Sequence, residues 1–261
     1  MARPLRVEYP GAFYHVLNRG IERRTLFNDD KDYENFLKLC RILHPKFKFI
    51  LHSYCLMPNH YHLYIETPDA NLSRLMQNLN SRYTQLFNRR YKRIGPLFQG
   101  RYKAILVDKE NYSLQISRYI HLNPVKAKIV SKPEDYKWSS YRSFLGREKQ
   151  EAFLETEWLL SQLANTIDRA KEDFHRFTME GIHDTWNPFG RARGGTFLGE
   201  ETFIDWAKEK FIAKAKDRSI SRLREIQKPQ DIGMTFPNPV DSLLRQDRLS
   251  FVFKGTQISE R

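Results

Sequence analysis

Cysteine is scarce in this sequence, and its scarcity excludes several kinds of site. Among 261 residues only Cys40 and Cys55 are cysteines, and neither belongs to a CxxC pair. A disulfide scaffold, a zinc ribbon and a cysteine-bound iron–sulfur cluster all need more cysteines than these two. We therefore expect none of the three.

Long apolar runs are also missing. The first ten residues, Met-Ala-Arg-Pro-Leu-Arg-Val-Glu-Tyr-Pro, contain no apolar segment of the signal-peptide kind. No later run approaches the ~20 apolar residues that cross a bilayer as a helix. The sequence predicts a soluble, cytoplasmic protein with no membrane partner.

Acidic residues are outnumbered by basic ones. The chain has 31 Asp and Glu against 44 Lys and Arg, which gives a formal net charge of +13 and a pI near 9.7. This excess favours a polyanionic partner, with nucleic acid first, because each neutralised phosphate releases counterions. A merely soluble basic protein would show the same excess. The hydrophobic fraction of 40% is sufficient for a packed core.

Apolar periodicity and turn residues predict alternating strands and helices in the first half of the chain. Strands are expected at 12–18, 47–56, 60–67 and 99–107, and helices at 31–43, 72–92 and 109–123. Asp108 would cap the last helix, and Pro45 and Pro124 would end the first and the last. The order βαββαβα is typical of an α+β fold, a ferredoxin-like antiparallel sheet with its helices on one face.

The character of the sequence changes beyond Gly146. We expect a catalytic domain over residues 1–146, followed by a helical, basic extension of unknown role over 147–261. Within the extension, 155–180 and 201–216 read as helical and 190–199 as a loop. Pro229, Pro237 and Pro239 occur in a C-terminal stretch with little periodicity, which predicts a poorly ordered tail.

Two histidines stand on the strand that follows the Pro58–Asn59 turn. Successive side chains of a strand point to opposite faces, so His60 and His62 project to one side and Tyr61 to the other. Two adjacent imidazoles supply two-thirds of a small metal site. The alternative is a pair of ordinary half-buried strand residues.

A single stripe of the helix after Asp108 carries Tyr119 and Asn123. If this helix covers the strand face of the two histidines, the phenol, the amide and both imidazoles share one small volume. Such nitrogen and oxygen ligands with open positions suit Mg²⁺ or Mn²⁺ bridging to a phosphate. The alternative is a core-facing helix in which the tyrosine hydroxyl finds a partner and Asn123-Pro124 is a helix stop.

Four separated motifs closely resemble one family. They are Tyr14-His15-Val16 with Arg19-Gly20, Met57-Pro58-Asn59-His60-Tyr61-His62, Gln99-Gly100-Arg101-Tyr102-Lys103, and Tyr119-Ile120-His121-Leu122-Asn123-Pro124-Val125-Lys126-Ala127. In this order they resemble the HUH single-tyrosine transposases, the IS200-like group, and within it the branch associated with repetitive extragenic palindromes. The resemblance covers about residues 5–146.

This resemblance implies roles for four residues. His60 and His62 would be metal ligands and Tyr119 the nucleophile, with Asn123 where insertion-sequence members carry a glutamine. The alternative is a weaker or different third ligand. Members of the family cleave single-stranded DNA beside a hairpin, leave a 5′-phosphotyrosine and a free 3′-OH, and use no nucleotide cofactor. The resemblance therefore implies a metal-dependent single-stranded DNA endonuclease and strand transferase.

Basic clusters flank these motifs and supply candidate DNA contacts. The candidates are Arg19, Arg23, Arg24, Arg82, Arg89, Arg90, Arg101 and Lys103. Each is about as well explained as a solvated surface charge. Tyr102 is a candidate for stacking on an unpaired base, whereas Tyr83 lies in an apolar stripe and reads as core.

Other functions are compatible with the same sequence features. A domesticated, catalytically silent protein that binds hairpin DNA or RNA would show the same charge, and a rolling-circle initiator or relaxase would use the same chemistry. Tyr83 and Tyr112 are rival nucleophiles, although neither has an Asn-Pro pair four residues on. The sequence also leaves open whether the tyrosine acts within one subunit or across a homodimer.

Overall fold

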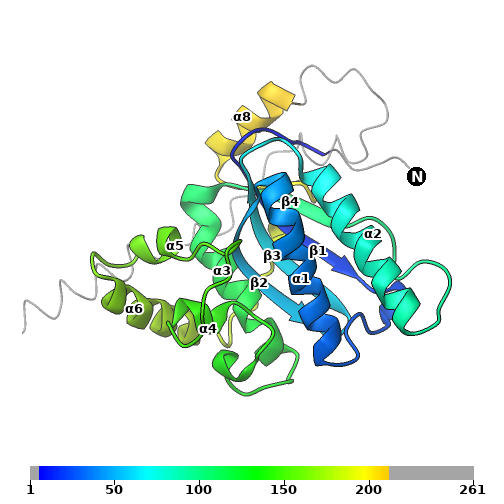
Figure 1. Cartoon of the computed structure of the whole chain (residues 1–261). Helices are drawn as coiled ribbons and strands as arrows, with labels where there is room; N and C mark the ends of the chain where they lie inside the picture. Colours follow the sequence, from blue (N-terminus) through cyan, green and yellow to red (C-terminus); the bar gives the residue numbers. More distant parts are fainter. Residues whose placement is uncertain (1–5, 212–261) are drawn as a thin grey trace, which may run out of the picture. The chain divides into compact units, whose positions relative to one another are not determined.

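The computed structural model describes residues 6–211 (Figure 1). Its strands are β1 (Ala12–Arg19), β2 (Ile50–Met57), β3 (His60–Thr67), β4 (Lys103–Val107) and β5 (Phe197–Leu198). Its α-helices are α1 (Asp30–Phe47), α2 (Leu72–Arg90), α3 (Lys109–Lys126), α4 (Tyr141–Phe144), α5 (Glu157–Ser161), α6 (Ile167–Glu180), α7 (Pro188–Arg191) and α8 (Glu201–Phe211). Short 3₁₀ turns occur at Ile21–Arg23 and Pro133–Asp135.

The five strands form one sheet in the order β2-β3-β1-β4-β5. The first four are antiparallel to one another where they pair, and β1 lies between β3 and β4. This confirms the predicted α+β fold, with the ferredoxin-like order of its first four strands. In the β1–β3 register Leu17 lies opposite His62, and Arg19 lies opposite His60. The histidine pair is thereby placed beside the C-terminal half of β1.

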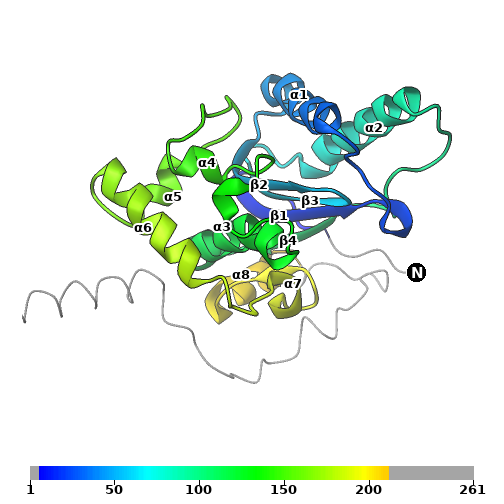
Figure 2. The ribbon, with the colours of Figure 1, turned by 90° about the horizontal axis from the view of Figure 1, so that it is seen from below.

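Helices α1 and α2 cover one face of the sheet, shown above it in Figure 2. The β3 residues that point to this face belong to the main apolar core. The Tyr61 ring packs on Phe36 of α1 with 5.0 Å between centroids, and Phe36 in turn meets Tyr83 of α2. Tyr83 is 1% exposed, so its expected place in the core is confirmed.

The opposite face is covered as well, which corrects the expectation that the helices lie on one face. Helix α3 packs there, where the hydroxyls of Tyr64 on β3 and Ser113 on α3 share a 2.5 Å hydrogen bond (Figure 2). Consecutive residues of β3 from Tyr61 to Ile65 are all buried. A strand buried on both faces needs a layer on each, and β3 with its unbroken aromatic and aliphatic run is such a strand.

Two prolines lie inside helices that they were expected to end. Helix α1 continues past Pro45 to Phe47, and α3 continues past Pro124 to Lys126. A proline in the last turn removes only one backbone hydrogen bond, which the packed helix tolerates. The actual end of α1 is Lys48, which takes a left-handed conformation with φ of 51°.

The extension packs onto the same sheet. The helix expected over 155–180 is present as α5 and α6, and the loop expected at 190–199 instead contains β5, which runs parallel to β4. The described part of the chain shows no break in packing at residue 146. The domain boundary there stays a prediction about the extent of the catalytic unit. Residues 212–261, with the predicted tail, lie outside the described residues.

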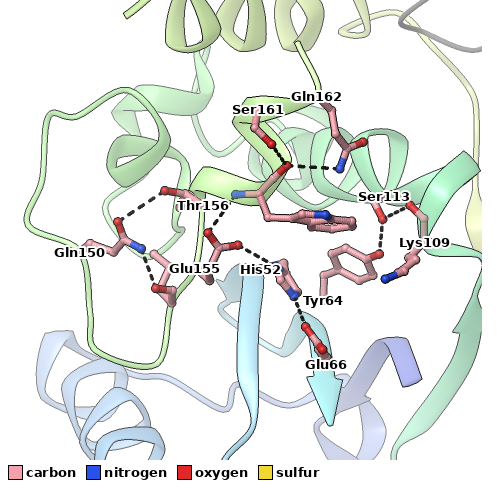
Figure 3. Close-up of polar contacts among 12 residues, drawn as sticks. His52, Tyr64, Glu66, Lys109, Ser113, Gln150, Glu155, Thr156, Ser161 and Gln162 are labelled. Atoms are coloured by element: carbon pink, nitrogen blue, oxygen red, sulfur yellow. Dashed lines mark hydrogen bonds and ion pairs between the residues drawn. The ribbon is translucent and has the colours of Figure 1, made fainter. Parts of the chain in front are cut away.

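A buried histidine ties the extension to the sheet (Figure 3). His52 of β2 is 2% exposed, and its two ring nitrogens contact Glu66 at 3.0 Å and Glu155 at 3.3 Å. Its ring also packs on Trp158 of α5, 5.1 Å between centroids. We call His52, Glu66 and Glu155 the His52 clasp. The two carboxylates raise the pKa of His52 above its ordinary value despite its burial.

Two further features bear on the class of protein. Cys40 and Cys55 are buried free thiols. Among residues 6–211 no helix combines the length and the apolar character that a bilayer crossing needs.

Candidate active site

A cavity of about 690 Å³ lies on the α3 face of the sheet. It is lined by Leu17, Asn18, Arg19, Arg23, Asn59, His60, His62, Gln99, Gly100, Arg101, Lys103, Tyr119, Asn123, Asn187 and Phe189. These residues come from the ends of β1, β3 and β4, from α3, from the extension, and from the turns and loops at residues 23, 59 and 99–101. The four residues expected to act together, His60, His62, Tyr119 and Asn123, all line it.

The two histidines of β3 stand beside each other, with 5.0 Å between ring centroids. His60 contacts the Asn59 side-chain oxygen through Nδ1 at 2.6 Å, and His62 contacts His15 Nε2 through Nδ1 at 2.9 Å. When each Nδ1 carries the hydrogen and donates it, each Nε2 keeps a free lone pair. The Asn59 oxygen can only accept, so it favours this tautomer for His60, and His62 has the same tautomer when His15 Nε2 is the acceptor.

Burial keeps these imidazoles neutral. It lowers the pKa of His60 to about 4, helped by the charge of Arg19, and it lowers the pKa of His62 well below its ordinary value. Burial also lowers the pKa of His15 to about 3. At neutral pH both predicted ligands therefore present lone pairs rather than positive charge.

Helix α3 brings the phenol and the amide to the same cavity. Tyr119 stands edge-on to the rings of His62 and His15, each with 5.7 Å between centroids. One turn later the Asn123 amide nitrogen donates to the Tyr119 carbonyl oxygen at 2.7 Å, which leaves the amide oxygen for another partner. All of these groups belong to one chain, so a single subunit contains the whole set.

The donor set fits a divalent cation with an incomplete protein shell. Two neutral imidazole nitrogens and one amide oxygen could hold Mg²⁺ or Mn²⁺, with water or phosphate oxygen in the remaining positions. In the described part of the chain no group of three or more His, Cys, Asp or Glu residues has metal-binding geometry. A three-ligand protein site here therefore depends on Asn123.

The Tyr119 phenol is harder to deprotonate than a free tyrosine. Burial raises its pKa, although the Lys126 ammonium lies 5.6 Å from the ring centroid. Desolvation outweighs a single partly exposed cation at that distance. Burial thus favours the neutral form of the phenol.

The predicted DNA contacts divide into two groups. Arg19, Arg23, Arg101 and Lys103 line the cavity, and Arg19 is held there by Gln99 Oε1 at 2.7 and 3.0 Å. Arg24, Arg82, Arg89 and Arg90 do not line it. The Arg90 guanidinium is bound to the carboxylates of Asp29 and Asp32, which anchors the end of α2 to the start of α1. DNA contact by this second group stays a prediction.

The rival tyrosines lie outside the cavity. The Tyr83 hydroxyl is buried and donates to the Leu26 carbonyl oxygen. The Tyr112 hydroxyl donates to Glu200 at 3.0 Å, and burial raises the pKa of that phenol. Of the three candidate tyrosines, Tyr119 is therefore the one that lines the cavity.

Three residues of the site were not foreseen from the sequence. His15 reaches His62 from the neighbouring strand, and Asn187 and Phe189 reach the cavity from the extension. His15 stands in one of the four motifs, and the sequence does not predict it as a ligand. No local pattern distinguishes Asn187 and Phe189, because their position depends on the return of the chain to β4.

Comparison with known proteins bears on the first half of the chain. Residues 9–123 match the family model described as transposase, IS200 like. A search of curated proteins gave no match. The matched segment contains all four residues that meet in the cavity.

Two solved structures are similar to this chain at low identity. A REP-associated tyrosine transposase bound to a REP hairpin is 18% identical, with a TM-score of 0.49 over 56% of this chain and 87% of that chain. A tRNA(His) guanylyltransferase from Saccharomyces cerevisiae is 12% identical, with a TM-score of 0.36 over 72% of this chain and 85% of that chain. Neither score reaches 0.5, so neither likeness decides the activity.

Proposed function

We propose that the protein, whose residues 9–123 match the IS200-like transposase family model, is a metal-dependent single-stranded DNA endonuclease and strand transferase. It would cleave beside a DNA hairpin through a 5′-phosphotyrosine intermediate. The observation that carries the proposal is the meeting of Tyr119 with His60, His62 and Asn123 in one cavity of a single chain. Pure nucleic-acid binding has no use for that combination.

Tyr119 would act as the nucleophile. Its phenolic oxygen attacks a backbone phosphorus, a new O–P bond forms, and the bond from phosphorus to the 3′ oxygen breaks. The phenol loses its proton and the departing 3′ oxygen gains one. The phosphotyrosine retains the energy of the phosphodiester, so attack by a 3′-OH on this linkage rejoins DNA without a nucleotide cofactor.

The other residues would position the reacting phosphate. His60, His62 and Asn123 would hold Mg²⁺ or Mn²⁺, which when bound supplies Lewis-acid polarisation of a phosphate oxygen. Arg19, Arg101 and Lys103 at the cavity would neutralise neighbouring phosphates. Because burial raises the pKa of Tyr119, we expect the phenol to lose its proton only when these charges and the phosphate are in place.

The test is covalent capture of DNA. A hairpin oligonucleotide with single-stranded flanks, labelled at its 3′ end, is incubated with the protein and Mn²⁺ and then resolved under denaturing conditions. We expect a labelled band of protein mass that disappears with Tyr119→Phe or EDTA. Tyr112→Phe is the matched control and should retain the band, because the Tyr112 hydroxyl contacts Glu200 outside the cavity.

The same experiment separates the rival function. Binding of the hairpin without any covalent band, across Mg²⁺ and Mn²⁺, would contradict the enzyme and favour a catalytically silent hairpin-binding protein. A band that persists in Tyr119→Phe would contradict the assignment of the nucleophile.

A further inference from the structure

A second cavity, of about 540 Å³, adjoins the catalytic one. The two share Gln99, Gly100, Arg101, Lys103 and Phe189 as lining residues. A single DNA strand that lies across the catalytic cavity can therefore continue into the second cavity without leaving the protein surface.

The walls of the second cavity come from both halves of the chain. One wall is β4 with the loop before it, and the other is the segment Gly194–Thr196 of the extension. The Thr196 carbonyl oxygen accepts a hydrogen bond from the Leu106 N–H at 2.7 Å, and Arg193 forms a bidentate pair with Glu201 at 2.7 and 2.8 Å. Gly194 and Gly195 turn the segment with φ of 57° and 65°. The extension wall is thus fixed to the edge of the sheet.

The edge of β4 presents backbone groups to this cavity. The N–H groups of Leu106 and Asp108 point toward the extension, where they donate to Thr196 and Leu198. Ala104 has the same parity along the strand, so its N–H and C=O point the same way. The β4–β5 pairing in the described chain begins only at Leu106, and Ala104 lines the cavity. A donor and an acceptor on one edge suit the polar edge of a nucleobase.

The side chains of the cavity suit an unpaired nucleotide. Arg101 and Lys103 supply positive charge, and the Arg6 guanidinium lies 4.2 Å from the ring centroid of Tyr102. The acidic lining residue Glu8 is engaged by the Ser73 backbone N–H at 3.0 Å. Phe189 is half-buried between the two cavities, and its ring packs on His15 with 4.9 Å between centroids.

We propose that the second cavity binds an unpaired nucleotide of the single strand that enters the catalytic cavity, with its base stacked on Phe189 and its phosphates facing Arg101 and Lys103. The inference rests on the proposed function and adds to it a site for the flank of the hairpin. The extension, which lies outside the matched residues 9–123, thereby takes part in choosing the strand. Tyr102, 7% exposed beneath Arg6, supports the wall and is not the stacking surface.

The test measures binding alone, in Tyr119→Phe protein without added metal. Hairpin oligonucleotides carry an abasic nucleotide at each flank position in turn, and dissociation constants are measured by fluorescence anisotropy. We expect one position at which loss of the base weakens binding about tenfold or more. Phe189→Leu should weaken binding of the intact oligonucleotide by a similar factor. For the oligonucleotide that is abasic at that position, the dissociation constant should be the same with Phe189→Leu as with Phe189.

Two further variants complete the cycle. With Phe189→Trp, removal of the base should again weaken binding. Ile94→Ala changes a 99% exposed apolar residue away from both cavities and should leave every dissociation constant unchanged. Two results would overturn this inference while the proposed function stands. One is a dissociation constant that is the same at every abasic position. The other is a factor lost on base removal that is equally large in Phe189→Leu and in the protein with Phe189. Failure of every oligonucleotide to bind would overturn the proposed function as well.

Discussion

At the scale of single residues, the Nδ1 atom of His62 contacts another histidine, His15, rather than a carboxylate. His15 is fully buried, and its Nε2 lies 2.9 Å from His62 Nδ1. Metal-bound histidines commonly donate their second ring N–H to an acceptor that fixes the tautomer. In this protein a neutral imidazole fills that place, so the pair stays uncharged within the sheet.

This contact predicts the effect of substituting His15. His15→Phe should weaken Mn²⁺ binding by about 10- to 100-fold, because His62 then loses the acceptor that holds its Nε2 toward the cavity. His15→Gln should restore most of the affinity, since its side-chain oxygen can take the position of Nε2. The measurement is a Mn²⁺ titration followed by electron paramagnetic resonance. Equal affinities for the Phe and Gln variants would contradict the prediction, and thermal melting checks that both fold.

How much of the site the sequence predicts follows from the range of each contact. His60 and His62 share a face because strand side chains alternate, and Tyr119 and Asn123 share a stripe because they lie one helical turn apart. Both relations can be predicted from the local sequence. The His15 contact needs the pairing of two strands that lie 45 residues apart in the chain, as the registered pair Leu17 and His62 shows. Local periodicity carries no information on that pairing.

At the scale of elements, the His52 clasp joins β2 and β3 to the start of the extension (Figure 3). Its raised pKa means that protonated His52 is favoured in the folded state. That stabilisation is fully present below the ordinary histidine pKa of about 6.5 and is lost as pH rises through the raised value. Glu155 behaves oppositely, because its pKa is lowered and its contribution is lost only in acid.

The clasp therefore predicts a pH-dependent stability. At pH 6 we expect His52→Gln to lower the free energy of unfolding by about 1–3 kcal/mol, the range for hydrogen bonds to charged groups. At pH 9 the loss should be clearly smaller, because His52 is then neutral in the parent protein. Urea unfolding at both pH values measures it, with the exposed His183→Gln as control. A loss that grows between pH 6 and pH 9 would contradict the clasp.

The order of the elements was predictable and their ends and layers were only partly so. Alternation and helical periodicity gave βαββαβα, and the structure confirms it. Proline was read as a helix stop at Pro45 and Pro124, yet packing carries both helices a further two residues. The two-residue strand β5 exists because it pairs with β4, so its own sequence contains no signal for it.

At the scale of the whole molecule, the net charge is +13, and some of the basic side chains form ion pairs whereas others line the two cavities. Arg90 is neutralised by Asp29 and Asp32, and Arg41 forms a bidentate pair with Glu151. Arg101 and Lys103 instead face the two cavities. Arg101 and Lys103 thus place positive charge beside the proposed reacting groups.

This distribution predicts the salt dependence of DNA binding. If several phosphates are contacted, hairpin affinity should fall by orders of magnitude between ~50 and ~200 mM salt. Lys103→Ala should reduce the slope of log affinity against log salt by about one, whereas Lys149→Ala, an exposed site outside both cavities, should leave the slope unchanged. Anisotropy titrations at several salt concentrations measure the slope. An affinity independent of salt would contradict nucleic-acid binding.

The hydrogen bond from Leu106 to Thr196 joins a segment of the extension to the domain that contains the proposed reactive groups. The protein residues proposed to act in the reaction all lie within residues 9–123, whereas one wall of the second cavity comes from a segment more than sixty residues further along the chain. Variation in the later segment can therefore retune which strand is admitted while the reaction chemistry is left intact. A version trimmed to the matched residues would keep its reactive groups and lose one side of its entrance.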